Sequence, residues 1–332
     1  MERPSTVVLT RRDVAALLTL DECIDAVEAA FARSARGQAL PSGVLGVPAR
    51  DGGFHVKAAG LQLERLYVAV KVNANFPGNP QRRGLPTIQG VIVLGDGETG
   101  VPLAVMDSIE ITAIRTAAAT AVAAKYLARA DAAVATVCGC GAQGSYQLRA
   151  LARVRPLRRA WAVDADGARA AAFARELTAA LGIPVDVASD RSAAMRESDA
   201  VITCTPARQA YVHRDDVAPG SFVAAVGADS HDKQELHPEL FVGTTIVVDS
   251  LEQCATIGDL HHALDAGVVT RGDVHGELAD IVAGTKPGRR RDDEIVVFDS
   301  TGVALEDVAA AALVYEKAVR LGAGTAIALG EP

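Results

Sequence analysis

Residues 133–144, AVATVCGCGAQG, join an apolar run to a glycine-rich turn. The run Ala133–Cys138 has the composition of a buried strand, and Gly139, Gly141 and Gly144 follow with the spacing G-x-G-x-x-G. In this motif one glycine permits the tight turn, the next lets a pyrophosphate approach the backbone, and the third allows close contact between helix and strand. A helix that begins behind the turn offers phosphates its free N–H groups and the positive end of its dipole. The segment therefore predicts a dinucleotide-binding unit.

An acidic residue stands at the distance that this motif requires. Asp164 ends the next apolar run, 20 residues after Gly144, where a carboxylate can accept hydrogen bonds from an adenosine ribose. A carboxylate repels a 2′-phosphate, so Asp164 favours NAD, but the nearby Arg169 leaves NADP open. The alternative is that the glycines only shape a turn. The combination of strand, helix and acidic residue favours the nucleotide site.

The chain on both sides of the loop indicates the fold class. After Asp107, helix-like stretches alternate with short apolar runs, which predicts βαβ units and a parallel sheet. These runs cover 133–138, 159–163, 185–188, 200–204, 222–226, 246–249 and 295–299. Before Asp107 we expect a strand at 6–10, a helix after Thr19, and strands at 54–58, 67–73, 91–94 and 101–106 in a mainly antiparallel sheet.

The expected fold is therefore α/β, with a Rossmann-type parallel sheet domain and a smaller α+β domain. We place the Rossmann domain at residues 117–312 and the smaller domain at 1–116 plus 313–332. Two domains also suit a chain of 332 residues.

Composition excludes several classes of protein. Hydrophobic residues make up 49% of the chain, which is ample for buried cores, and the net charge of −8 disfavours binding to nucleic acid. The odd count of five cysteines indicates no disulfide framework and fits a reducing cytosol. We expect no targeting or membrane segment. Cys138 and Cys140 lack the second cluster that a zinc site needs, so we interpret them as small apolar residues and expect no metal.

Four charged residues away from the loop are candidates for chemistry. Lys57 and Lys71 lie in strand-like runs, where a lysine either extends from a sheet edge or forms a buried ammonium with an anionic partner or a lowered pKa. Arg115 is the only cation in an otherwise uncharged helical turn. Asp229 follows an apolar strand at the edge where ligands of parallel sheets collect, although a helix-capping aspartate is equally consistent with that position.

Several segments together resemble the ornithine cyclodeaminase/mu-crystallin family of NAD(P)-dependent enzymes. They span nearly the whole chain in the family's order, and the most specific are RTAA and GAD-x-x-x-K-x-EL. The matching segments are VKVNANFPGNP (70–80), GDGETGVPLAVMD (95–107), ITAIRTAAATAVAAKYLA (111–128), the glycine loop, DAVITCTP (199–206), GADSHDKQELHPEL (227–240) and DSTGVALEDVAAAALVY (299–315).

The resemblance implies a homodimer whose smaller domain builds the dimer interface and the substrate site. It implies that Lys71 is the active-site lysine, that Arg115 holds the substrate carboxylate, and that Asp229 is an acid/base or water-positioning group. It also implies cofactor contacts from Thr116, Gly141, Ala142, Gln143 and Asp164, nicotinamide-side contacts from Thr205, Val226, Gly227 and Ala228, and a segment closing over the substrate at Gly302 and Val303.

Three departures from the family pattern bear on the substrate. His55 stands where ornithine-specific members have a carboxylate, Lys57 where they have methionine, and the run Pro41-Ser42-Gly43 lacks an arginine found in many members. Without the carboxylate a distal ammonium would be left unpaired, which is costly. Lys57 adds a site for an anion, so His55 and Lys57 are candidate substrate-binding residues.

We therefore expect an NAD(P)-dependent oxidoreductase that acts at the carbon–nitrogen bond of a small amino or imino acid with a neutral or acidic side chain. The alternatives are a cyclodeaminase that uses NAD catalytically, a non-enzymatic binder of dinucleotide and small ligand of mu-crystallin type, and a different Rossmann enzyme such as a methyltransferase. The retained Lys71 and Asp229 argue against the binder, and the full glycine motif argues against the methyltransferase.

Overall fold

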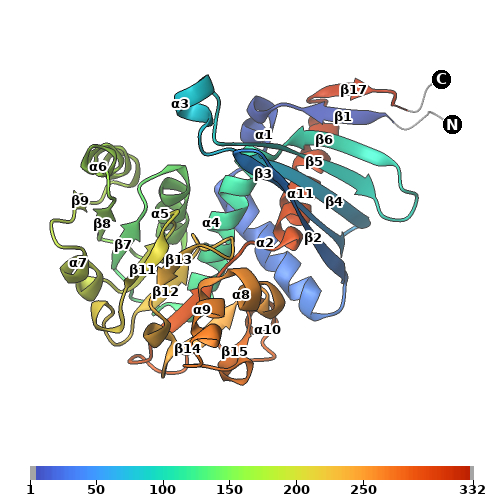
Figure 1. Ribbon diagram of the computed structural model, residues 1–332. Coiled ribbons are helices and arrows are strands. Elements are labelled where there is room, and N and C mark those ends of the chain that lie inside the picture. Colours follow the sequence, from blue (N-terminus) through green and yellow to red (C-terminus); the bar gives the residue numbers. More distant parts are fainter. Residues whose placement is uncertain (1–4, 330–332) are drawn as a thin grey trace. The chain divides into compact units, whose positions relative to one another are not determined.

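The computed structural model describes residues 5–329, which form two compact units (Figure 1). The first unit runs to Thr116 and resumes at Val303, and the second comprises Ala117–Gly302. The first boundary falls inside helix α4 (Ser108–Leu127). The second lies just before helix α11 (Ala304–Leu321), which the sequence-based boundary at residue 312 would divide. This helix runs unbroken and packs on the strands of the first unit, so its whole length groups with them.

The first unit consists of a seven-stranded sheet and the helices packed against it. Its elements, besides α4 and α11, are β1 (Thr6–Leu9), α1 (Arg11–Leu17), α2 (Leu20–Ala35), β2 (Ala39–Ala49), β3 (Gly52–Gln62), β4 (Leu66–Asn75), α3 (Asn79–Arg83), β5 (Ile88–Asp96), β6 (Pro102–Asp107) and β17 (Thr325–Ile327). The strand order is β17-β1-β6-β5-β4-β3-β2, antiparallel throughout except between β1 and β6.

The two faces of this sheet differ. Helix α11 packs along β3 and β4 and against α2, so the inner face is buried (Figure 1). Leu61, Tyr67 and Ile92 on this face are almost fully buried. On the other face Val72 pairs with Val91 in register, and Val91 is exposed. The first unit thus carries apolar side chains on both faces of its sheet, and its described helix α11 packs on the inner face.

Helix α2 begins where the sequence predicts it. The Thr19 hydroxyl accepts from the Glu22 N–H, and the Glu22 carboxylate accepts from the Thr19 N–H, which completes a capping box. A second box, between Thr10 and Asp13, begins α1, which the sequence analysis did not identify. It also missed β2, because this strand contains Pro41 and is exposed along most of its length, so no apolar alternation marks it.

The second unit is built on an eight-stranded parallel sheet. Its strands and helices in chain order are β7 (Val134–Cys138), α5 (Ala142–Val154), β8 (Arg159–Val163), α6 (Gly167–Leu181), β9 (Val185–Val187), α7 (Arg191–Glu197), β10 (Ala200–Thr203), β11 (Arg208–Val212), η1 (Arg214–Asp216), β12 (Phe222–Ala225), β13 (Gln234–Leu236), η2 (Pro238–Phe241), β14 (Thr245–Val248), α8 (Leu251–Ile257), α9 (Asp259–Asp265), η3 (Arg271–Asp273), β15 (Val274–Glu277), α10 (Leu278–Val282) and β16 (Val296–Asp299). Strands β11 and β13 form a separate two-stranded sheet.

The order of the large sheet confirms the expected Rossmann-type class. It runs β15-β14-β16-β12-β10-β7-β8-β9, so the chain leaves β7 toward one side and returns to its other side at β10. Ligands of such sheets bind outside the carboxyl ends of the strands at this reversal. Strands β10, β12, β14 and β16 are buried at every position, which is why they appear in the sequence as continuous apolar runs. None of the described helices is long and apolar enough to cross a bilayer.

Candidate active site

The glycine loop of the second unit has the geometry that its spacing predicts. Strand β7 ends at Cys138 and α5 begins at Ala142, with Gly141 at the N-cap and no side chain capping the helix. Gly139 has a φ of 106°, a conformation that favours glycine. A Cβ at Gly144 would lie 2.1 Å from the Gly139 carbonyl oxygen. The loop therefore requires glycine at both positions. The first turn of α5, which includes Gln143, follows it with no side-chain cap, the arrangement found where helices bind phosphates.

Asp164 ties this loop to the end of the neighbouring strand. It follows β8, and its Oδ2 accepts from the Cys140 N–H at 2.8 Å. Its Oδ1 accepts from the Asp166 N–H at 2.9 Å and from Arg169 Nη1 at 3.4 Å. Asp164 and Arg169 thus lie together beside the loop, as an adenosine-binding edge requires.

A pocket of about 680 Å³ adjoins the loop between α5 and α6. Its lining residues are Cys140, Gly141, Ala142, Ser145, Tyr146, Arg149, Arg169, Ala172, Phe173 and Glu176. The adenosine and pyrophosphate of a dinucleotide need a helix N-terminus without a side-chain cap, glycines where a Cβ would clash, and an adjacent carboxylate. All three are present here. The residues present therefore fit NAD.

A buried glutamate joins the two loops that we assigned to the nicotinamide side. Glu235 Oε1 accepts from the N–H and hydroxyl of Thr205, each at 2.7 Å, and from the Tyr211 hydroxyl at 2.8 Å. Its Oε2 accepts from the Gly227 N–H at 2.8 Å. Thr205 follows β10 and Gly227 follows β12, with the buried Val226 and Ala228 on either side. The structure thus brings together the expected nicotinamide-side residues, and the sequence analysis did not identify Glu235.

Asp249 organises the last loop of this unit. Its Oδ2 accepts from the Gly302 N–H at 2.6 Å and from the Ser300 hydroxyl at 3.0 Å. Gly302 has a φ of 75°, which again favours glycine. Val303, the next residue, is the N-cap of α11.

Asp229 lies on an exposed part of its loop. Its side chain is 56% exposed, and Oδ1 pairs with Lys233 Nζ at 2.5 Å. It lies two residues after Gly227, at the edge of the sheet where the sequence places it. It does not cap a described helix, and its role as acid/base or water-positioning group stays a prediction.

A buried ionic cluster occupies the inner face of the first unit's sheet. Lys57 on β3 is the register partner of Lys71 on β4, so both side chains lie on the same face. Lys71 Nζ pairs with Asp307 Oδ2 at 2.7 Å. Arg115 on α4 pairs through Nε with Asp307 Oδ1 at 3.0 Å and through Nη1 with Glu306 Oε2 at 2.6 Å. The structure therefore gathers the three predicted cations, which come from three separate elements.

The surroundings of Lys71 change its acid–base behaviour. Burial, followed by the positive charge of Arg115, lowers the pKa of Lys71 to about 7, while Asp307 acts in the opposite direction. A lysine with this pKa changes between its protonated and neutral forms near neutral pH, whereas an exposed lysine stays protonated there.

Glu306 and Asp307 are the residues of this cluster that the sequence analysis missed. Both lie in the first turns of α11, where acidic residues commonly compensate the helix dipole, so their positions alone gave no sign of a site. Their complete burial is the informative feature, because buried carboxylates require cationic partners or several hydrogen-bond donors. His55 lies two residues before Lys57 on the same face of β3 and is exposed, and Thr116 lies next to Arg115 on α4.

The cysteines of the loop are buried thiols. Burial raises the pKa of Cys138 and Cys140, so neither is a reactive thiolate. Among residues 5–329 no group of three or more His, Cys, Asp or Glu side chains is arranged to hold a metal ion.

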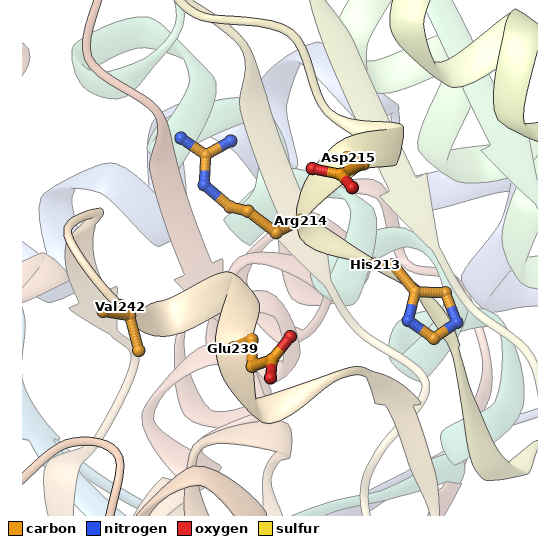
Figure 2. Close-up of a pocket in the computed structure, with 5 residues that line it drawn as sticks. All are labelled: His213, Arg214, Asp215, Glu239 and Val242. Carbon is orange, nitrogen blue, oxygen red and sulfur yellow. The ribbon is translucent and has the colours of Figure 1, made fainter.

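A second hollow lies at the 3₁₀ helices η1 and η2 of the second unit. Figure 2 shows its five side chains. His213 precedes η1, Arg214 and Asp215 lie in η1, Glu239 lies in η2, and Val242 follows η2. The hollow measures about 530 Å³. None of these five side chains is buried, and they carry mixed charges.

These two centres, a glycine loop that fits a dinucleotide and a buried cluster of lysine, arginine and carboxylates, lie in an α/β protein with a Rossmann-type sheet. The chain belongs to the ornithine cyclodeaminase/mu-crystallin family, whose model matches residues 4–321. The family expected from the sequence is thereby confirmed.

Three solved structures are similar over nearly the full chain. An archaeal alanine dehydrogenase dimer with bound NAD is 39% identical with a TM-score of 0.93, covering 98% of this chain and 99% of the other. The Δ1-pyrroline-2-carboxylate reductase of Thermococcus litoralis, in complex with NADH and L-proline, is 37% identical with a TM-score of 0.92, covering 97% and 100%. The iminosuccinate reductase of Paracoccus denitrificans with NAD⁺ is 31% identical with a TM-score of 0.86, covering 98% and 100%.

Proposed function

We propose that the protein is an NAD-dependent oxidoreductase that acts at the carbon–nitrogen bond of a small amino or imino acid. The observation that carries the proposal is the cluster of the half-buried Lys57 with the buried Lys71, Arg115, Glu306 and Asp307. When all are ionised, these five side chains carry three positive charges and two negative ones. The excess positive charge suits a substrate carboxylate. The relatives that carry NAD, NADH or NAD⁺ support the cofactor, with NADP left open by Arg169.

The residues of the cluster have distinct roles in this proposal. Bound NAD supplies or accepts a hydride at C4 of its nicotinamide. Arg115 and Lys57 orient the substrate carboxylate, and the ion pairs of Arg115 with Glu306 and Asp307 hold its guanidinium in place. Lys71, with a pKa of about 7, takes a proton from the substrate nitrogen or the attacking water in one direction and returns it in the other. Asp229 holds the nitrogen or the water.

The side chains near Lys57 support an acid with a neutral or acidic side chain. His55 and Lys57 offer no carboxylate to a distal ammonium, which disfavours ornithine and lysine as substrates. A second carboxylate on the substrate would instead form an ion pair with Lys57. The likeness to an iminosuccinate reductase is consistent with this preference.

The exposed apolar face of the first unit supports a homodimer. Val72 and Val91 are register partners there, and the neighbouring Val70 pairs with Val93. Large exposed apolar faces mark interaction surfaces, and the similar archaeal alanine dehydrogenase is a dimer. We also place the protein in the cytosol, which its five unpaired cysteines support.

A substrate screen tests the proposed function. Amino acids are supplied with NAD⁺, and 2-oxo acids plus ammonia or amines are supplied with NADH or NADPH. The absorbance of the reduced coenzyme is followed in each case. We expect net coenzyme turnover with at least one small acid. Proline formation from ornithine without net NADH would instead identify a cyclodeaminase, and no turnover with tight NADH binding would favour the non-enzymatic binder.

A further inference from the structure

Asp307 and Glu306 occupy adjacent positions of one helix and both pair with Arg115, and Asp307 also pairs with Lys71. Asp307 is 1% exposed, and its two carboxylate oxygens contact two cations from different elements, Lys71 on β4 and Arg115 on α4. Glu306 is equally buried, but its ion pair is with Arg115. Asp307 therefore links the lysine to the arginine through its two carboxylate oxygens.

We propose that Asp307 is a positioning residue for the reaction, which holds the Lys71 ammonium in place and sets the pH at which it gives up its proton. The inference rests on the proposed role of Lys71 as the proton carrier. The first turns of α11 thereby belong to the site, although they contribute no group that touches the reacting atoms.

The charges around Lys71 support this assignment. Lys57 on β3 and Arg115 on α4 are positive and favour the neutral amine, as burial does. Glu306 on α11 pairs with Arg115, and burial keeps the Cys23 thiol of α2 neutral by raising its pKa. Asp307 directly contacts the ammonium and opposes these effects, while Arg115 and Lys71 hold its own pKa below the usual value. Without Asp307, the protonated lysine would face two cations in a buried setting, so its pKa must fall.

The test compares Asp307→Asn with Glu306→Gln. Each variant removes one buried carboxylate from the same helix, so the two are matched. Titration of Lys71 is followed by NMR in protein labelled with ¹³Cε-lysine, with the resonance assigned by Lys71→Arg. We expect the midpoint of Lys71 to move to lower pH by about one unit or more in Asp307→Asn, and by clearly less in Glu306→Gln. The corresponding limb of the pH profile of kcat/KM should move in the same direction.

The NMR titration separates this inference from the proposed function, because it requires no turnover. A shifted midpoint without any catalytic activity would sustain the role of Asp307 toward Lys71 and reject the oxidoreductase. Equal shifts in both variants, or none in Asp307→Asn, would overturn the inference. If Asp307→Asn does not fold, Asp307→Glu keeps the charge but moves it. We then expect a midpoint close to that of the native protein with a reduced kcat, and an unchanged kcat would count against positioning.

Discussion

The catalytic role proposed for Asp229 can be tested against Asp232, a similarly exposed aspartate in the same loop. Asp229 pairs with Lys233 and Asp232 pairs with Arg208, and the two carboxylates are 56% and 54% exposed. Exposed ion pairs contribute only about 0–1 kcal/mol, so neither Asp→Asn change should affect stability measurably. If Asp229 holds the reacting nitrogen or water, Asp229→Asn lowers kcat by about 100-fold or more, while NADH binding measured by fluorescence persists. Asp232→Asn should keep full turnover, and equal losses in the two variants would remove Asp229 from the mechanism.

Lys57 allows a test of substrate choice. Replacing it by methionine, the residue of ornithine-specific members, removes a charge-assisted hydrogen bond of about 1.5–3 kcal/mol. We expect the KM for the preferred acid to rise about tenfold or more, because each 1.4 kcal/mol is a factor of ten. Lys57→Arg, which retains the charge, is the control and should recover most of the affinity. An unchanged KM in Lys57→Met would show that this lysine does not bind the substrate.

Single residues differ in how far the sequence reveals them. Gly139, Gly144 and Asp164 could be located because their spacing along the chain carries the meaning of the motif. Asp307 could not, because its partner Arg115 lies 192 positions away and a carboxylate in the first turns of a helix is ordinary. Glu235 could not be located either, because it joins two loops that only the folded chain brings together.

The turn between β7 and α5 makes a prediction about the whole strand–loop–helix element. A Cβ at Gly144 would meet backbone at 2.1 Å, which no rotamer change can relieve. Gly144→Ala should cost about 1–3 kcal/mol of stability, as overpacking usually does, and should weaken NADH binding because the loop must open. Gly167→Ala is the matched control. Gly167 is the first residue of α6, and no atom lies within 4 Å of a Cβ built there. The melting temperature of the Gly167→Ala protein should therefore stay the same or rise. Thermal unfolding with and without NADH measures both effects, and an unaltered Gly144→Ala protein would contradict the close contact.

Elements were predictable where burial on both sides left an unbroken apolar run. Strands β10, β12, β14 and β16 are of this kind, and all four coincide with runs in the sequence. Strand β2 could not be found, since its side chains are exposed and its pairing with β3 depends on backbone hydrogen bonds that carry no sequence signal.

The homodimer that we propose would form through the exposed apolar face of the seven-stranded sheet. Val91 on β5 is 43% exposed there, and Val187 on the edge strand β9 of the second unit is 44% exposed. A charge at Val91 would have to be desolvated between two copies of the sheet, whereas a charge at Val187 would remain in water. We therefore expect Val91→Asp to shift the protein from dimer to monomer in light scattering coupled to size-exclusion chromatography, and Val187→Asp to leave the dimer intact. A stable interface buries about 800 Å² on each partner, and one central charge is enough to disrupt its apolar core. A dimer that survives Val91→Asp unchanged would mean that copies associate through another surface.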